Sequence, residues 1–174
     1  MNNVTVISTS LNPDSKSQIL ATKLVVQLES QGVTVARIDL RDHGLLPAGS
    51  PGCWEHPDLE GIKAKIEGAS HIVFAVPIYC YDVNSAAKNL IELTGKSFTE
   101  KVIAFMCSAG GQGSYMAVMG MANHLMLDFR CVIVPRFFYA AGSDWSEEGV
   151  LDPNLEERIV NMPNDMKRIS VAAE

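Results

Sequence analysis

The sequence predicts an α/β fold in which helices cover both faces of a parallel sheet. Apolar runs of four to eight residues, rich in Val and Ile, alternate along the chain with segments of helical periodicity. The first run is continuously apolar, as expected of a strand buried on both faces. The chain has 174 residues, of which 47% are hydrophobic and 20% charged, so it can bury a substantial core. We therefore expect one domain over residues 1–174.

Three strands and two helices are predicted in the first part of the chain. In order, strand first, they occupy residues 4–7, 15–31, 33–40, 58–68 and 71–76. The longer helix has apolar positions at helical spacing and is ended by Gly32. Asp58 follows a proline and is the expected N-cap of the shorter helix, which ends at Gly68.

Three helices and two strands are predicted in the rest of the chain. In order, helix first, they occupy residues 85–94, 102–107, 113–127, 131–134 and 153–169. The third of these segments is rich in Met, which we expect to fill the core. Pro163 is expected to kink or split the last helix. Two loops, at residues 41–57 and 140–152, are long enough to be lids or interface segments.

Five strands and five helices in this order predict a flavodoxin-like three-layer sandwich. Its five-stranded parallel sheet has the expected order 2-1-3-4-5, with a switch point between the first and third strands. Open α/β sheets bind their ligands at the carboxyl edge. Three loops rich in Ser, Thr, Gly, Tyr and Pro leave that edge, at residues 8–17, 77–81 and 108–113. We expect these three loops to form one pocket.

The first loop has the composition of a phosphate-binding site. Ser10, Asn12, Ser15 and Ser17 precede or begin the first predicted helix. The N–H groups at a helix N-terminus lack intrahelical partners, and the helix dipole favours an anion there. The segment matches neither GxxxxGKS/T nor GxGxxG, so neither a P-loop nor a dinucleotide fingerprint is present. In the alternative interpretation, Ser15 only caps the helix and the rest is a solvated turn.

Composition and charge exclude several classes of partner. A net charge of −6 and a pI near 5.2 do not provide the basic field that nucleic acids or anionic membranes require. The chain has no apolar run of about 18 residues, so we expect no transmembrane helix and no secretory signal. Cys53, Cys80, Cys107 and Cys131 are widely spaced, and the four histidines are scattered. These spacings predict reduced, mostly packed cysteines in a cytoplasmic protein and no metal site.

Motifs in all three loops resemble those of the NADPH-dependent FMN reductase family, over nearly the whole chain. The family's phosphate loop, of the type GSxRxxSxN, is matched by residues 9–17. Its Gly-rich third loop is similar to residues 108–113, and its acidic segment near the C-terminus to residues 147–152. Its second signature, which resembles PxYNxxxxxxLKNxID, is matched by Pro77, Tyr79, Lys88, Asn89, Ile91 and Glu92.

Three positions depart from the family pattern. Thr9 stands in place of the usual Gly, and Asn12 in place of an Arg that commonly helps to bind phosphate. Cys80 stands in place of the Asn that usually follows the tyrosine. Lys16 is a candidate for the missing positive charge, although its side chain equally fits a position facing solvent.

The resemblance implies an FMN-containing reductase that takes a hydride from NADPH or NADH at flavin N5. It then passes electrons to a small-molecule acceptor: a flavin, a quinone, an azo dye or a metal oxyanion. The alternative is a non-enzymatic FMN-binding electron-transfer protein. No catalytic side chain is expected, because the cofactor performs the chemistry. The residues expected to bind the FMN phosphate are Ser10, Asn12, Ser15, Lys16 and Ser17. Those expected along one edge of the flavin ring are Pro77, Ile78, Tyr79, Cys80 and Tyr81. Those expected at its pyrimidine end are Ser108, Gly110, Gly111 and Gln112.

The resemblance also implies self-association, as a homodimer or a homotetramer. The loop at residues 41–57 contains the apolar side chains Leu45, Leu46, Pro47 and Trp54, which fit an interface better than water. Lys88 and Glu92 are spaced at i,i+4, a spacing that allows a pair within one helix or contacts to a neighbouring subunit.

Overall fold

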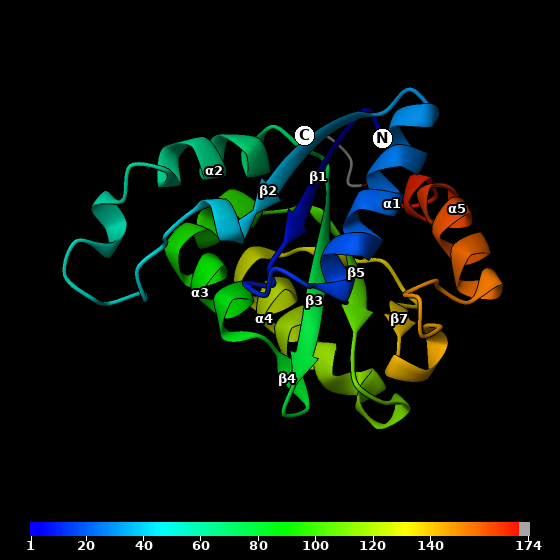
Figure 1. The fold of residues 1–174 in the computed structure, drawn as a ribbon. Coiled ribbons are helices and arrows are strands. Elements are labelled where there is room, and N and C mark those ends of the chain that lie inside the picture. The colour runs from blue at the N-terminus through cyan, green and yellow to red at the C-terminus, as the bar shows by residue number, and fades with distance from the viewer. Residues whose placement is uncertain (171–174) are drawn as a thin grey trace.

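The computed structural model describes residues 1–170, which form one sheet with helices on both faces (Figure 1). The path of the sheet is β2-β1-β3-β5-β6, and all neighbours on this path are parallel. Because β4 is a short strand off the path, this is the order predicted from the sequence, and the flavodoxin-like fold is confirmed. The strands of the path are β1 (Asn3–Ser8), β2 (Thr34–Asp39), β3 (His71–Tyr79), β5 (Val102–Ser108) and β6 (Val132–Ile133).

Two helices cover one face of the sheet and three cover the other (Figure 1). The first pair is α1 (Lys16–Ser30) and α5 (Pro153–Lys167). The other three are α2 (Leu59–Glu67), α3 (Ser85–Thr94) and α4 (Met119–Phe129). Within residues 1–170, none of the helices combines the length and the apolar character needed to cross a membrane.

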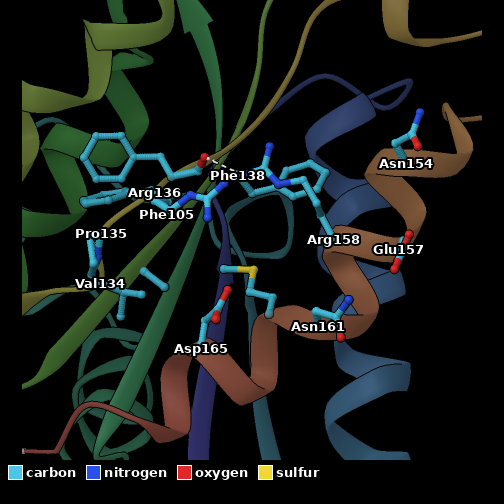
Figure 2. Close-up of a pocket in the computed structure, with 13 residues that line it drawn as sticks. Phe105, Val134, Pro135, Arg136, Phe138, Asn154, Glu157, Arg158, Asn161 and Asp165 are labelled. Atoms are coloured by element: carbon cyan, nitrogen blue, oxygen red, sulfur yellow. Dashed lines mark hydrogen bonds between the residues drawn. The ribbon is translucent and has the colours of Figure 1, made fainter.

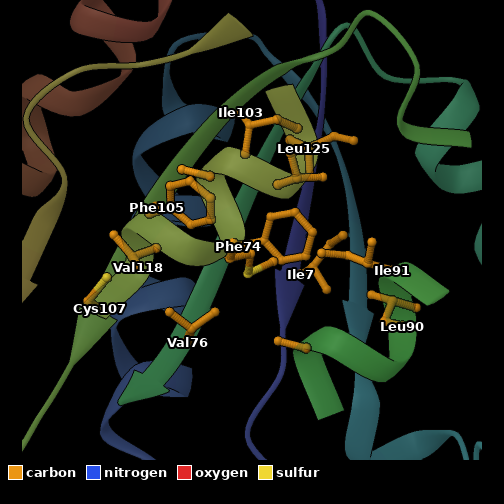
Figure 3. Packing of buried hydrophobic residues seen from close by; sticks show 14 of the residues in the cluster. Ile7, Phe74, Val76, Leu90, Ile91, Ile103, Phe105, Cys107, Val118 and Leu125 are labelled. Atoms are coloured by element: carbon orange, nitrogen blue, oxygen red, sulfur yellow. The ribbon is translucent and has the colours of Figure 1, made fainter. Parts of the chain in front are cut away.

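A hydrophobic core lies on each face of the sheet, and the larger one packs under α2, α3 and α4 (Figure 3). At its centre the ring of Phe74 lies 5.5 Å from that of Phe98 and 6.0 Å from that of Phe105, measured between centroids. Burying a side chain of this size stabilises a fold by about 1.5–3 kcal/mol. The core therefore fixes β3 and β5, whose carboxyl ends begin two of the three predicted site loops.

β3 continues further than predicted because it includes Pro77, where the sequence was expected to break the strand. Pro77 stays in register with Ser108 of β5. On its other side β1 has already ended, and the Thr9 N–H makes the last bond, to the Ala75 carbonyl. Proline has no N–H, and at this position β1 no longer provides a carbonyl that such an N–H could bind. The ladder therefore loses no hydrogen bond at Pro77. Its carbonyl accepts a hydrogen bond from the Asn84 N–H at 3.2 Å.

The described sheet has seven strands, two more than predicted. β4 (Asp82–Val83) forms an antiparallel hairpin with the end of β3. β6 is shorter than predicted, and β7 (Phe138–Ala140) follows it along the same edge of β5. Pro135 lies in the gap between β6 and β7, where it lacks the N–H needed to continue the ladder.

Two of the predicted helices differ in detail from the structure. The segment expected to be helical from residue 113 begins as a 3₁₀ helix, η4 (Gln112–Val118), since Gly and a non-helical Ser114 disfavour an α-helix there. The last helix is not split at Pro163. That proline is buried beside Met162 and Met166, and this packing outweighs the one lost backbone bond.

The connections contain further short 3₁₀ turns. They are η1 (Leu40–Asp42), η2 (Cys53–Glu55), η3 (Gly95–Phe98) and η5 (Gly142–Asp144). Asp58 occupies the N-cap position of α2, as predicted, but its side chain makes no cap bond. Its carboxylate instead lies 2.7 Å from Nδ1 of His43. This bond holds the beginning of the 41–57 loop against the N-terminus of α2.

Candidate functional site

The carboxyl ends of β1, β3 and β5 lie side by side, and the three predicted site loops leave the sheet there (Figure 1). Ser8 at the end of β1 is in register with Ala75 of β3, and Pro77 of β3 is in register with Ser108 of β5. Adjacent parallel strands therefore bring the three loops to one edge, where open α/β sheets bind ligands. Their role in cofactor binding stays a prediction.

The first loop places three serine side chains out of solvent at the N-terminus of α1. Ser10, Ser15 and Ser17 expose 2%, 6% and 1% of their surface. The Ser10 hydroxyl accepts from the backbone N–H of Asn12 at 3.3 Å, and the hydroxyls of Ser15 and Ser17 lie 2.9 Å apart. Ser15 also caps α1, because its hydroxyl accepts from the Gln18 N–H at 3.2 Å. The cap proposed in the alternative interpretation is therefore present, together with a cluster of buried hydroxyls.

The N-terminal end of α1 combines the positive end of the helix dipole with one lysine, and Asp14 lies directly before its N-cap. Its first turn contains no acidic residue and begins with Lys16. The Lys16 ammonium lies 5.3 Å from the centre of the Trp145 ring, within the range of a cation–π contact. The helix dipole and this ammonium together favour an anion at the first loop. Asn12, where the family has an arginine, is exposed and adds no charge.

Arg41 ties the end of β2 to the first loop. Its Nη1 donates to the Pro13 carbonyl at 3.3 Å, while Nε and Nη2 bind the Asp39 carboxylate. Burial raises the pKa of Asp39, but the hydrogen bonds and the positive charge of Arg41 outweigh it and hold that pKa below its usual value. Because its charge is neutralised by Asp39, Arg41 fixes the loop without adding a free cation to it.

The second loop is a tight hairpin between β3 and β4. Its two central residues, Cys80 and Tyr81, both have left-handed backbones, with φ of 52° and 61°. Two successive positive φ values are typical of a type I′ turn, which favours Asn and Gly. Tyr79 and Tyr81 are 53% and 74% exposed at the rim of the site. Ile78, by contrast, has its side chain in the core, so only its backbone is available to a ligand.

The third loop offers open glycine backbone. A β-carbon at Gly110 or Gly111 would meet no other atom within 4 Å, so packing within the described chain does not require glycine there. A β-carbon at Gly113 would lie 3.6 Å from the hydroxyl of Tyr81, which places the second loop directly against the third. Ser108 is buried at the start of the loop.

The third loop is tied to the long loop at residues 140–152. The Asp144 carboxylate accepts from the backbone N–H of Ala141 at 2.7 Å and from Nε2 of Gln112 at 3.3 Å. The Tyr139 hydroxyl donates to the Gly111 carbonyl. The Gln112 side chain is therefore turned toward the long loop and belongs to the support of the site.

A pair of hydrogen bonds joins the first loop to Asn84, the residue between β4 and α3. The Thr9 hydroxyl donates to Oδ1 of Asn84 at 2.7 Å, and Nδ2 of Asn84 donates to the Thr9 carbonyl at 2.6 Å. Both residues are buried. We call this pair the Thr9–Asn84 clasp.

The sequence analysis assigned no role in the site to five residues that shape this edge: Thr9, Asn84, Tyr139, Asp144 and Trp145. Signals for some of them were present. Asn84 directly precedes the third predicted helix, and the last two lie in a loop already noted for its length. The pattern could not reveal their partners, because each reaches across to a segment far away in the chain.

A hollow of about 670 Å³ adjoins the site on the α3 side. Apolar side chains from the first loop, the 41–57 loop and the β4 hairpin line it, together with Lys88, Glu92 and His124. Lys88 and Glu92 pair within α3, with Nζ and Oε1 2.8 Å apart. The structure therefore contains the predicted pair within one helix.

A second cavity, of about 220 Å³, lies between the interrupted edge of the sheet and α5 (Figure 2). Arg158 donates to the Phe137 carbonyl at 3.1 Å, and its guanidinium lies 5.4 Å from the centre of the Phe138 ring. None of the predicted cofactor-binding residues lines this cavity. The three-loop edge remains the candidate site.

All four cysteines are free; Cys53, Cys107 and Cys131 are buried, and Cys80 is exposed in the second loop. Burial raises the pKa of the Cys107 thiol to about 12 and that of Cys131 to about 11, so both stay protonated at neutral pH. Among residues 1–170, no three His, Cys, Asp or Glu side chains are grouped to hold a metal ion.

Comparison with known proteins identifies relatives of the whole chain. The sequence profile of the NADPH-dependent FMN reductases matches residues 2–146. A probable NADPH:quinone oxidoreductase 2 from Oryza sativa subsp. japonica is 23% identical over 175 residues, covering 91% of this chain and 84% of that protein. The fold is similar to the apo form of an NADH:FMN oxidoreductase, with a TM-score of 0.80, 14% identity and coverage of 99% and 92%. It is also similar to the flavoenzyme FerB, an NAD(P)H:(acceptor) oxidoreductase from Paracoccus denitrificans, with a TM-score of 0.73, 19% identity and coverage of 98% and 100%.

Proposed function

We propose that this chain, which belongs to the NADPH-dependent FMN reductase family, holds one FMN among its three edge loops and uses it to reduce small-molecule acceptors. The family establishes the class of enzyme as an NAD(P)H-dependent flavin oxidoreductase with FMN as cofactor. The class and the cofactor expected from the sequence are thereby confirmed, and the alternative of a non-enzymatic electron carrier is set aside. The residues that bind the cofactor, and the acceptor, are the proposal.

One observation supports this site above the others. Three buried serine hydroxyls lie at the positive end of α1, on the same edge as a glycine loop whose backbone is open. Hydroxyls and free helix N–H groups suit a phosphate, and glycines let a backbone approach a flat ring closely. Packing within the chain does not require the glycines. The serine hydroxyls have partners within the chain and still have donor and acceptor capacity, so a phosphate bound at this edge would add to bonds that are already present.

The chain's own residues would divide the binding of FMN among the loops. Ser10, Ser15 and Ser17 would donate to the phosphate, with the Lys16 ammonium nearby as a counter-charge. Tyr79, Cys80 and Tyr81 would border one edge of the ring, and Pro77 and Ile78 would contribute only backbone. Ser108, Gly110 and Gly111 would approach the pyrimidine end, and Gln112 would hold that loop in place through Asp144. When bound, FMN supplies a ring that accepts a hydride from NAD(P)H and gives up electrons.

The rim of the site suits flat aromatic acceptors. Tyr79 and Tyr81 are exposed in the second loop, and Tyr115 and Met116 are exposed in η4, which follows the third loop. Aromatic faces stack on planar rings in offset or edge-to-face geometry. We propose flavins, quinones and azo compounds as acceptors, in line with the quinone oxidoreductase relative, and metal oxyanions as a further class.

We also propose that the chain forms a homodimer or a homotetramer in the cytoplasm. The hollow of about 670 Å³ has an apolar wall, and beside it Leu46 and Trp54 of the 41–57 loop are exposed. An apolar surface of this kind, rimmed by charged groups, suits a subunit interface. The free cysteines fit a reducing compartment. Light scattering at micromolar concentration would contradict self-association if it gave the mass of one chain.

Rapid mixing of the FMN-loaded protein with NADPH or NADH tests the proposal directly. We expect a yellow protein whose flavin absorbance is bleached by at least one of the two donors, and recovers when a quinone is added. An FMN titration of folded protein that gave no binding would remove the proposed site. Binding without bleaching by either donor would instead restore the electron carrier.

A further inference from the structure

We propose that Asn84 is a positioning residue, which through the Thr9–Asn84 clasp holds the first loop ready to bind the FMN phosphate. This inference rests on the proposed function of the three-loop site. Neither residue belongs to the predicted set of cofactor contacts. Their effect on the cofactor is transmitted through the backbone of the first loop.

Thr9 is hydrogen-bonded at every polar group that it has, and the clasp supplies the bonds of its carbonyl and its hydroxyl. Its backbone N–H donates to the Ala75 carbonyl at 3.1 Å, and its own carbonyl accepts from Nδ2 of Asn84 at 2.6 Å. Its hydroxyl donates to Oδ1 of Asn84 at 2.7 Å and lies 3.3 Å from the Ala75 carbonyl. Thr9 is 0% exposed and Asn84 is 6% exposed, so water does not compete for these bonds.

The side chain of Asn84 is committed to the first loop. Asn84 occupies the N-cap position of α3, where an asparagine normally accepts from a backbone N–H of the first helical turn. Here its side chain makes no cap bond. Both ends of its amide face Thr9 instead, 75 residues earlier in the chain. A role limited to starting α3 does not account for this geometry.

The first loop begins at the residue that the clasp holds. Ser10 follows Thr9 directly, is almost fully buried, and accepts from the Asn12 N–H. Thr9 stands where the resembled family has glycine, and glycine has no hydroxyl to donate to an asparagine. The loop of this chain therefore has a polar anchor that a glycine at residue 9 would lack. A site whose donors are held in place before binding loses less entropy when the ligand arrives.

The inference predicts a selective loss of phosphate recognition. FMN and riboflavin, which lacks the phosphate, are each titrated into the purified, flavin-free full-length protein, and the melting temperature is recorded. In Asn84→Ala we expect the Kd for FMN to rise roughly tenfold or more, and that for riboflavin to rise less than about threefold. Thr9→Val replaces the hydroxyl with a methyl group and should change the ratio of the two Kd values in the same direction. Thr9→Ser keeps the hydroxyl and should leave this ratio at its wild-type value.

Asn89 provides a matched control on the same helix. Its Oδ1 accepts from the Ala48 N–H at 2.7 Å and its Nδ2 donates to the Leu46 carbonyl at 3.0 Å, so it is also an asparagine bound at both ends to a loop backbone. Asn89→Ala should lower the melting temperature as Asn84→Ala does, and leave the ratio of the two Kd values unchanged.

The outcomes separate the clasp from the site itself. A wild-type protein that binds no FMN overturns the proposed function. A wild-type protein that binds FMN, with Asn84→Ala losing FMN and riboflavin equally or losing only thermal stability, overturns the positioning role. If Asn84→Ala does not fold, Thr9→Val against Thr9→Ser decides: equal Kd ratios in these two variants overturn it.

Discussion

The two ends of the sheet use hydrogen bonds for different purposes. At the amino end, side chains bind backbone that would otherwise be loose: Nε2 of His71 donates to the Ile169 carbonyl at 2.9 Å, and Nζ of Lys101 donates to the Glu67 carbonyl at 2.8 Å. At the carboxyl end, serine hydroxyls are buried against one another and two left-handed residues form the tip of a hairpin. The same five parallel strands thus end in side-chain-to-backbone ties on one side. On the other side they end in ties of this kind together with hydroxyls and loop backbone that can still bind a ligand.

This difference indicates which part of the molecule contributes to folding stability and which part is available to bind a ligand. The His71 and Lys101 bonds at the amino end lie away from the three loops, so removing one of them should affect folding alone. Hydroxyls and backbone at the carboxyl end satisfy only one another, and they have capacity left for a ligand. Substitutions at the two ends should therefore be distinguishable by measuring both unfolding and FMN binding.

The largest expected effect is at the carboxyl end, in Ser15→Ala. If Ser15 donates to the phosphate, its removal takes away a hydrogen bond to a charged group, worth about 1.5–3 kcal/mol. The Kd for FMN should then rise roughly ten- to a hundredfold, measured by calorimetric titration. Riboflavin should bind the wild-type protein poorly and should be almost insensitive to the change.

Asp152 is the matched control for the helix-capping role of Ser15. It caps α5, which has the same length as α1, by accepting from the Asn154 N–H at 2.8 Å. Asp152→Ala should cost about 1 kcal/mol of folding stability and leave the affinity for FMN unchanged. If Ser15→Ala behaves in the same way, or weakens FMN and riboflavin equally, the phosphate is not held at the first loop and the contrast between the two ends fails.

A smaller effect is expected at the amino end, where His71 makes folding pH-dependent. Burial lowers the pKa of His71 below its usual value near 6.5, and the N-terminal ammonium adds to this against the hydrogen bonds to the Ile169 and Met166 carbonyls. Well above pH 6.5 the imidazole is neutral in both states, and its contribution to stability is complete. As the pH falls below 6.5, the unfolded chain takes up a proton more readily than the folded protein, so the free energy of unfolding decreases.

Urea denaturation between pH 7.5 and pH 5 measures this decrease. His71→Gln should be less stable than wild type at neutral pH, and its further loss of stability on acidification should be smaller. His43, His56 and His124 are present in both proteins, so their titration cancels in the comparison. Parallel curves for the two proteins would contradict the assignment to His71, and a change in FMN affinity at constant pH would contradict the separation of the two ends.

Sequence patterns predicted the layers of the molecule better than its connections. The predicted helix at residues 85–94 has the observed bounds Ser85–Thr94, because its periodicity and its flanking residues are local signals. Pro77 was expected to end β3, since no local signal indicates that β1 has already ended beside it. The gap between β6 and β7 likewise depends on the pairing with β5, which the local pattern does not contain.

The candidate site could be predicted as three loops but not as a network. Ser10, Ser15 and Ser17 lie close together in one loop, so the composition of that loop was enough to indicate them. Ile78 lies in the second predicted loop, between Pro77 and Tyr79, yet its side chain packs in the core. Asn84 and Asp144 act on loops far away in the sequence, and only the folded arrangement reveals their partners. Long-range polar contacts are thus the part of the site that local patterns could not provide.

The smallest expected effect concerns strain at the tip of the second loop, in Cys80→Asn. Cys80 has a φ of 52° and is followed by a second left-handed residue, a combination that costs most side chains conformational energy. Asparagine adopts this conformation more readily, and it is also the residue that the family usually has here. The substitution should raise the free energy of unfolding by about 0.5–1 kcal/mol, measured by urea denaturation of the flavin-free protein. Cys53→Asn, at a buried site in a 3₁₀ turn without positive φ, should do the opposite. A loss of stability in Cys80→Asn would mean that the thiol itself makes a stabilising contact at the tip, one that outweighs the relief of backbone strain.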